Sequence, residues 1–358
     1  MSVSLTQRID ESSSQARANG AVRIWLLAVA LMVFAMIVVG GAVRLTDSGL
    51  SITEWQPLLG AIPPLTEAHW LEAFEKYRAI PQYSALNHGM SLEEFKFIYW
   101  WEWAHRFLGR FIGMVFGLPL IAFWALGKVR GRFALKLLGV LALGGLQGAI
   151  GWYMVKSGLV DRIDVSQYRL ALHLLTAFAI LALLVWLTLD VSDDRRVRLR
   201  TVTRGQMRMA VALFVLIFVQ SGFGALVAGL NAGLTYNTWP LMDGSLVPNG
   251  LGTLAPWYLN IFENVTTVQF NHRVMAYAVV VLAAVHLFTV IRSADDERVI
   301  GSAGLLFACL IAQMLIGIWT LLWGVPLWLG LAHQGGAAIV VAAATLHLHA
   351  ITRARSDS

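Results

Sequence analysis

Long apolar runs alternate with shorter polar segments along the whole chain. A helix of about 20 apolar residues is long enough to cross the hydrocarbon core of a bilayer. Runs near that length predict eight transmembrane helices, at 22–43, 105–127, 135–155, 168–189, 209–230, 272–291, 300–323 and 329–350. Two long polar loops, 44–104 and 231–271, follow the first and the fifth of these predicted spans.

The composition strengthens this interpretation, since 58% of the residues are hydrophobic and only 13% are charged. Such values lie outside the range of soluble globular proteins, so the sequence predicts an all-α integral membrane protein. The net charge of +6 is unevenly distributed, and Lys and Arg gather in the two tails and in the loops 128–136, 190–208 and 292–298. By the positive-inside rule these segments are cytoplasmic. We therefore expect both termini inside a bacterial inner membrane, with lipid rather than nucleic acid as the surrounding partner.

Several segments of the chain occur twice. The stretch "GGAVRLTDSGLSITEW" resembles "GALVAGLNAGLTYNTW", "EWAHR" resembles "QFNHR", and "LQGAIGWYMV" resembles "AQMLIGIWTLL". This pattern predicts two tandem four-helix units that form a parallel internal repeat. The expected parts are a cytoplasmic tail (1–22), an N-terminal unit (23–190), a cytoplasmic linker (191–208), a C-terminal unit (209–351) and a second cytoplasmic tail (352–358).

Each predicted unit carries two histidines near the outer ends of its second and fourth spans. His105 and His173 belong to the first unit, and His272 and His333 belong to the second. Ionisable groups inside membrane spans are costly and usually face a partner in the bundle interior. Facing imidazoles in a four-helix bundle suit axial ligation of a haem iron, so we expect all four histidines to bind haem iron. A simple hydrogen bond between helices explains one such histidine, but explains four repeated ones poorly.

Charged residues accompany the histidines at the start of the second span of each unit. Arg106 and Arg273 follow His105 and His272 directly, and are possible partners of haem propionates. Glu102 lies one helical turn before His105, whereas Gln269 occupies the aligned position of the second unit. Because only the first unit keeps an ionisable group there, we expect Glu102 to take part in proton transfer and the chemistry to occur in that unit.

A second arrangement of histidines suggests another function. His286 and His347 lie 14 residues beyond His272 and His333, about 21 Å along a helix. Quinol-oxidising b-type cytochromes stack two haems across a membrane with such a spacing. A second, inner haem near this pair, and hence a non-catalytic cytochrome that takes electrons from quinol, is therefore an alternative.

Other conspicuous residues have ordinary explanations. Two amphipathic stretches of the first outer loop, 66–79 and 91–103, are expected to lie at the membrane interface, where tryptophans gather. His69 and His88 are expected at the surface of that loop. Cys309 is the one cysteine of the chain, so no intramolecular disulfide forms.

With these motifs assembled, the chain resembles the haem A synthase family. The resemblance rests on "GGAVRLTDSGLSITEWQPLLGAIPP", "MSLEEFKFIYWWEWAHRFLGR" and the later "NHR" and "AHQ", and covers about residues 24–350. It is closest to the branch found in mitochondria and alphaproteobacteria, which lacks the outer-loop cysteine pair of another branch. The resemblance implies an eight-span enzyme that oxidises the C8 methyl group of haem O to a formyl group, giving haem A for cytochrome oxidase.

The resemblance also implies specific roles for the histidines. The C-terminal unit would hold a haem b on His272 and His333, and the N-terminal unit would hold the substrate haem O and the product haem A on His105 and His173. The glutamate that corresponds to Glu102 is implicated in activity. Implied partners are a haem O synthase, cytochrome oxidase assembly factors and an electron donor, and a homo-oligomer is possible.

Overall fold

The computed structural model describes residues 5–56, 59–159, 162–192 and 202–355, and within these ranges the chain is helical without a strand. Its helices are α1 (Leu5–Leu45), α2 (Glu67–Arg78), α3 (Pro81–Leu86), α4 (Leu92–Ala125), α5 (Gly131–Lys156), α6 (Gln167–Ser192), α7 (Arg204–Gly229), α8 (Asn260–Glu263), α9 (Val265–Ser293), α10 (Glu297–Leu322) and α11 (Leu327–Arg355), with short 3₁₀ turns at Leu59–Ala61, Ala232–Leu234 and Trp257–Leu259. Eight of the described helices are long and apolar enough to cross a membrane, which confirms the all-α membrane fold. Part of the predicted linker 191–208 and the ends of both tails lie outside the described residues.

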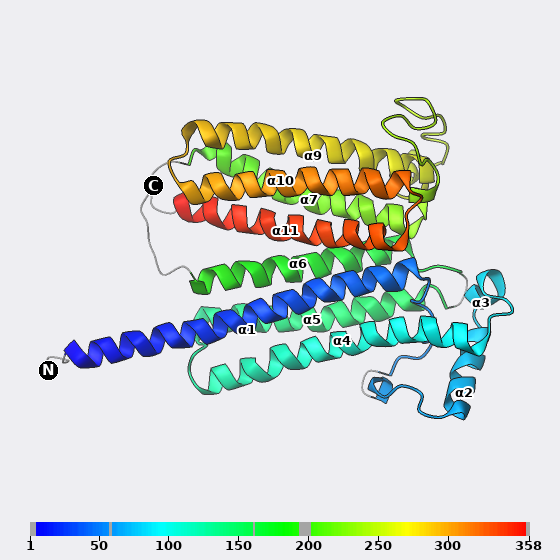
Figure 1. Ribbon diagram of the computed structural model, residues 1–358, viewed down its shortest axis with the longest axis horizontal. Coiled ribbons are helices and arrows are strands. Elements are labelled where there is room, and N and C mark those ends of the chain that lie inside the picture. The colour runs from blue at the N-terminus through cyan, green and yellow to red at the C-terminus, as the bar shows by residue number, and fades with distance from the viewer. Residues whose placement is uncertain (1–4, 57–58, 160–161, 193–201, 356–358) are drawn as a thin grey trace.

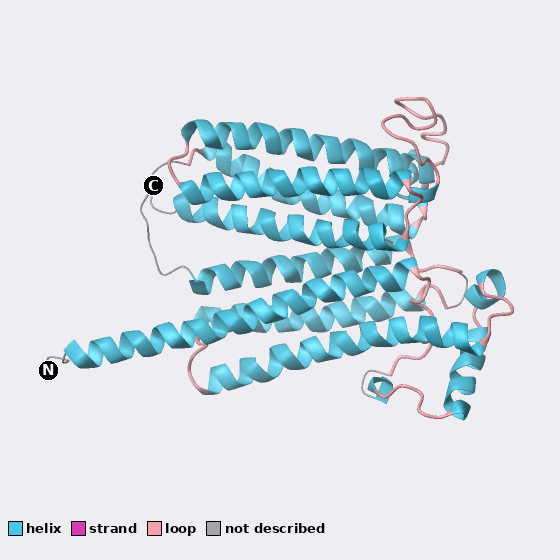
Figure 2. Ribbon diagram, viewed as in Figure 1, coloured by secondary structure: helices cyan, strands magenta, loops and turns pink. Residues whose placement is uncertain are grey.

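The long helices lie roughly parallel in two groups (Figure 1). One group contains α1, α4, α5 and α6, and the other contains α7, α9, α10 and α11. Helix α6 contacts both α7 and α11, and α1 contacts α11, so these helices form the junction between the groups. The first and last helices begin and end at the same end of the bundle, as an even number of spans requires, and the long loops lie at the opposite end (Figures 1 and 2).

Helix α4 begins earlier than the apolar pattern indicated. Ser91 and Glu94 form a capping box, in which the Ser91 hydroxyl accepts from the Glu94 amide and the Glu94 carboxylate accepts from the Ser91 amide. Such a box satisfies backbone donors that the first helical turn leaves free. The amphipathic stretch 91–103 is therefore not a separate interfacial element. It forms the first turns of α4 and carries Glu102 into the same rigid helix as His105.

An aromatic cluster attaches the first outer loop to this extension of α4. The rings of Phe74 and Phe95 stack with centroids 4.9 Å apart, and Tyr77 and Tyr83 pack edge to face beside them. The Tyr77 hydroxyl donates to Gln82 and accepts from Asn87, so its polar tip is satisfied although the ring is fully buried. Burial raises the pKa of Tyr77 above its ordinary value. This cluster fixes α2 and α3 against the N-terminal end of α4.

The two helix groups are also joined at the end that carries the termini. The Asp190 carboxylate of α6 accepts hydrogen bonds from Lys136 of α5 and from Arg353 of α11, and His349 of α11 lies 3.2 Å from it. Apolar side chains continue the junction toward the middle of the bundle, where Leu26, Phe178 and Val341 are fully buried. The helix groups thus share one core, and the positions of the histidines in both groups are fixed relative to each other.

Candidate functional site

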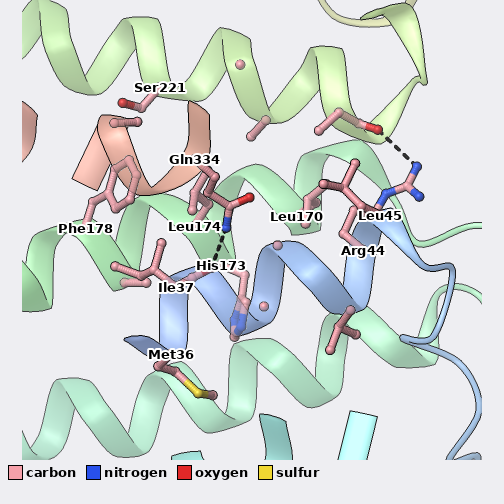
Figure 3. A pocket seen from close by; sticks show the side chains of 18 of the residues that line it. Met36, Ile37, Arg44, Leu45, Leu170, His173, Leu174, Phe178, Ser221 and Gln334 are labelled. Carbon is pink, nitrogen blue, oxygen red and sulfur yellow. Dashed lines mark hydrogen bonds between the residues drawn. The ribbon is translucent and has the colours of Figure 1, made fainter. Parts of the chain in front are cut away.

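A cavity of 1410 Å³ lies inside the bundle and is lined by both helix groups. All four histidines that the sequence singled out line it: His105 of α4, His173 of α6, His272 of α9 and His333 of α11. Apolar side chains and glycines form most of the remaining wall, together with a few polar groups. In the close view of Figure 3, His173 and Met36 reach the cavity from neighbouring helices, and Gln334 bridges to the carbonyl of Ile37.

The geometry of the second pair is compatible with a shared metal. The ring centroids of His272 and His333 are 6.4 Å apart, and the ring planes are inclined by 84°. A metal lies about 2 Å from a coordinating imidazole nitrogen, and the ring centre lies roughly 1 Å further, so two imidazoles on one iron have centroids about 6 Å apart. The observed separation therefore leaves room for one metal ion between the rings.

A glycine of a neighbouring helix faces each of the four rings. A Cβ atom added to one of these glycines would lie 3.2 Å or less from an imidazole atom: Gly40 meets His105, Gly151 meets His173, Gly224 meets His272 and Gly317 meets His333. The tightest case is Gly317, where the added carbon would lie 2.7 Å from His333 Cε1. Because only glycine lacks this carbon, the four positions allow the imidazoles to lie flat against the adjacent helix.

Glutamines hold three of the histidines from the side. The side-chain amides of Gln147, Gln220 and Gln313 donate to the backbone carbonyls of His173, His272 and His333, at 2.9, 3.1 and 2.8 Å. Each amide nitrogen also lies within 3.4 Å of a ring nitrogen of the same histidine. The nitrogen approached is Nδ1 in His272 and His333 and Nε2 in His173. A group beside Nδ1 orients an imidazole whose Nε2 binds a metal. The sequence pattern alone does not indicate this role of the glutamines, although the repeated segments align Gln147 with Gln313.

Glu102 is buried at the mouth of the cavity and accepts four hydrogen bonds. One carboxylate oxygen accepts from the Ser51 hydroxyl and the Ile52 amide, both at 2.7 Å. The other accepts from the guanidinium of Arg106, at 2.6 and 3.1 Å. Only 2% of the surface of Glu102 is exposed. The ion pair and the two other donors therefore replace the hydration that the carboxylate loses on burial.

The two arginines bind the outer loops in equivalent ways. Arg106 donates to the carbonyls of Ile52 and Glu54, and Arg273 donates to the carbonyls of Tyr236 and Thr238. These acceptors occupy aligned positions in the repeated segments, as do Asp47 and Asn231, which both adopt left-handed backbone conformations. The matching contacts support the predicted internal repeat. Both arginines also line the cavity, and Arg273 Nε is buried without a partner.

In the second unit, Gln269 occupies the place of Glu102 but makes fewer contacts. Its amide nitrogen donates to the Tyr236 carbonyl at 3.2 Å, and its buried side-chain oxygen has no partner. Gln269 and Arg273 therefore hold the second loop without an ionised carboxylate. The difference between the units that the sequence indicated thus appears as a buried charge on one side of the cavity and a neutral amide on the other.

The inner histidines, His286 and His347, contact each other directly. His286 Nε2 and His347 Nε2 are in direct hydrogen-bond contact at 2.7 Å, and Ser302 bonds the other nitrogen of His347. An iron between two imidazoles would separate these nitrogens by about 4 Å, twice a metal–nitrogen bond. Neither residue lines the cavity, and both are 1% exposed. This direct contact gives no support to the alternative of an inner haem at His286 and His347. His69 and His88 lie exposed in the outer loop, as expected.

Comparison with known proteins gives matches over nearly the whole chain. A profile of the cytochrome oxidase assembly protein family, COX15-CtaA, matches residues 23–345. A protein of Parvibaculum lavamentivorans named Heme A synthase is 50% identical over 333 residues, which cover 93% of this chain and 95% of the relative. Proteins of the same name from Chelativorans sp. and Brucella anthropi are 53% and 48% identical, over 92% and 98% of this chain and 90% and 98% of their own length.

Proposed function

The chain belongs to the cytochrome oxidase assembly protein family, COX15-CtaA, and on this basis we propose that it is a haem A synthase. The enzyme is an oxidoreductase that converts the C8 methyl group of haem O to the formyl group of haem A. The observation that carries the proposal is the 1410 Å³ cavity lined by two pairs of histidines, one pair in each helix group. A planar macrocycle needs such an apolar space with imidazoles at opposite faces.

The two histidine pairs have different roles in this proposal. His272 and His333 hold a resident haem b, for which the separation of their rings is suitable. When bound, a haem with two histidine ligands carries single electrons, because it has no open position for oxygen. His105 and His173 bind haem O as the substrate and haem A as the product. The wall beside the second pair carries Gln269 in place of a carboxylate, which agrees with electron transfer, and the Glu102 carboxylate beside the first pair agrees with proton-coupled oxidation.

We assign two tasks to Glu102. Through Ser51 and Ile52 it holds the first outer loop over the cavity and limits the access of water. As an ionised carboxylate next to Arg106, it accepts protons that leave the methyl carbon during oxidation. Arg106 and Arg273, whose contacts lie at the same rim of the cavity, are the candidate partners of the haem propionates.

The surroundings of the enzyme follow from the same assignment. We propose a bacterial inner membrane location, with both termini in the cytoplasm as the distribution of Lys and Arg indicates. The histidine pairs then lie in the outer half of the membrane. A haem O synthase supplies the substrate, assembly factors of cytochrome oxidase receive the product, and a separate electron donor or acceptor completes the redox cycle.

Expression together with a haem O synthase, followed by chromatography of the extracted haems, tests the proposal. Cells with the wild-type chain are expected to contain haem A, and the purified protein should carry haem b. A His173→Ala variant should lose haem A formation but keep haem b, whereas His88→Ala, in the exposed part of the outer loop, should behave as the wild type. Absence of haem A and of its hydroxylated precursor from wild-type cells would overturn the assignment.

A further inference from the structure

The four cavity histidines are not held equally. His173, His272 and His333 each receive a hydrogen bond at the backbone carbonyl from a glutamine of an adjacent helix. The same amide nitrogen approaches the ring of that histidine, at 3.1 to 3.4 Å. Within the described residues, the His105 ring makes no hydrogen bond, and no side chain donates to the His105 carbonyl, which accepts only within helix α4. One histidine of the substrate pair is thus oriented only by packing.

The internal repeat identifies what replaces the missing glutamine. Extending the aligned segments 40–55 and 224–239 by one helical turn toward the N-terminus pairs Met36 with Gln220. Gln220 of α7 is the residue that holds His272. Met36 of α1 lies at the corresponding place beside α4, where a Cβ atom added to Gly109 would be 3.3 Å from Met36 Cε. It also lines the cavity together with His105.

The two side chains are similar in length and volume but differ in hydrogen bonding. The glutamine amide donates through its nitrogen and accepts through its oxygen, whereas a thioether has no donor and is a weak acceptor. Loss of such a supporting group around a metal-binding histidine typically weakens metal affinity by about 10- to 100-fold. The Met36 position therefore keeps the shape of the site and removes the group that would hold the imidazole in place.

We propose that His105 is the exchangeable ligand of the substrate haem, and that Met36 is the positioning residue that permits its release. The inference rests on the proposed function, because it concerns the haem held by His105 and His173. Release of His105 opens one face of the substrate iron, on the side where Glu102 and Arg106 form the wall. His173, which Gln147 holds, remains bound and keeps the substrate in place. Gln220 and Gln313 hold both histidines of the other pair, His272 and His333, so the iron of that haem keeps both ligands and has no open position.

Carbon monoxide binding to the purified, reduced protein tests this inference. Carbon monoxide needs an open position on the iron, so it binds a haem with two histidine ligands only as fast as one histidine leaves. The formyl group of haem A separates its absorption from that of haem b, and each haem is therefore followed individually. In the wild type, the haem of the first unit should bind carbon monoxide and haem b should not.

A reciprocal exchange of the two residues provides the decisive variants. Met36→Gln is expected to slow carbon monoxide binding in the first unit by about 10-fold or more. Met36→Leu, which adds no hydrogen-bonding group, should bind as the wild type does. Gln220→Met should make haem b reactive toward carbon monoxide. The inference is overturned if carbon monoxide binds the first-unit haem of Met36→Gln as fast as that of the wild type. It is also overturned if, in the wild type, carbon monoxide binds only haem b.

Two further outcomes separate this inference from the proposed function. Wild-type cells that make haem A, combined with an unaltered carbon monoxide reaction of Met36→Gln, would leave the synthase assignment intact and remove only the role of His105. Wild-type cells without haem A, combined with carbon monoxide binding to haem b in Gln220→Met but not in the wild type, would overturn the synthase assignment and leave the effect of the glutamine intact. Should Met36→Gln fail to retain haem, Gln220→Met decides, and unreactive haem b in that variant counts against the inference.

Discussion

Glu102 and Arg106 form a buried ion pair one helical turn apart in α4, with Arg106 Nη2 only 2.6 Å from the carboxylate. Both residues also bind the first outer loop, Glu102 through Ser51 and Arg106 through the carbonyl of Ile52. The pair therefore connects a transmembrane helix, the loop above it and the wall of the cavity. A change in its charge is therefore expected to alter both the attachment of the loop to α4 and the wall of the cavity.

Replacement Glu102→Gln removes the charge and keeps the shape of the side chain. We expect haem A formation to fall by about 100-fold or more, the effect typical of a missing acid–base group, while haem b remains bound at His272 and His333. Haem extraction from cells that also express a haem O synthase measures both effects. Gln269→Glu, the reciprocal change in the second unit, is the matched control and should leave haem A formation high. Haem A production at the parental rate in Glu102→Gln would contradict proton transfer by this residue.

Replacement Gly317→Ala should displace His333 selectively. The added carbon would lie 2.7 Å from His333 Cε1, and such a contact forces the ring away from the helix. We expect the purified variant to lose most of its haem b, as seen in its absorption spectrum. Gly304→Ala lies in the same helix α10 but meets no atom within 4 Å, so it should keep its haem. Full haem b content in Gly317→Ala would show that the close approach is unnecessary.

The buried contact between His286 and His347 should affect stability rather than haem content. His286→Leu removes the 2.7 Å hydrogen bond and leaves a buried imidazole nitrogen of His347 without its partner. Such a loss costs about 1–3 kcal/mol, so the variant should denature at a lower temperature while it retains the haem content of the wild type. Thermal denaturation in detergent, followed by haem extraction, measures both quantities. A loss of one haem per chain would instead support an inner haem at this pair.

Much of the molecule follows from local pattern alone. Eight apolar runs determined the eight membrane-spanning helices of the described residues. Inside a bilayer no water bonds the backbone amide and carbonyl groups, and a helix bonds all of them within one segment. The placement of His105, His173, His272 and His333 near one end of their apolar runs also follows from counting residues along each run. The repeated segments identified the equivalent arginines and loops. Their alignment also placed Glu102 and Gln269 at equivalent positions.

Tertiary structure decided which of these groups meet. His286 and His347 have the spacing of haem ligands, yet their rings touch each other, because spacing along a helix does not specify the distance between two helices. Gln147, Gln220 and Gln313 became significant only when packing brought each one beside a histidine. The capping box at Ser91 extended α4 into the outer loop and made Glu102 part of a rigid wall. Sequence thus determined the kinds of groups and their depth, and helix packing determined which groups share the cavity.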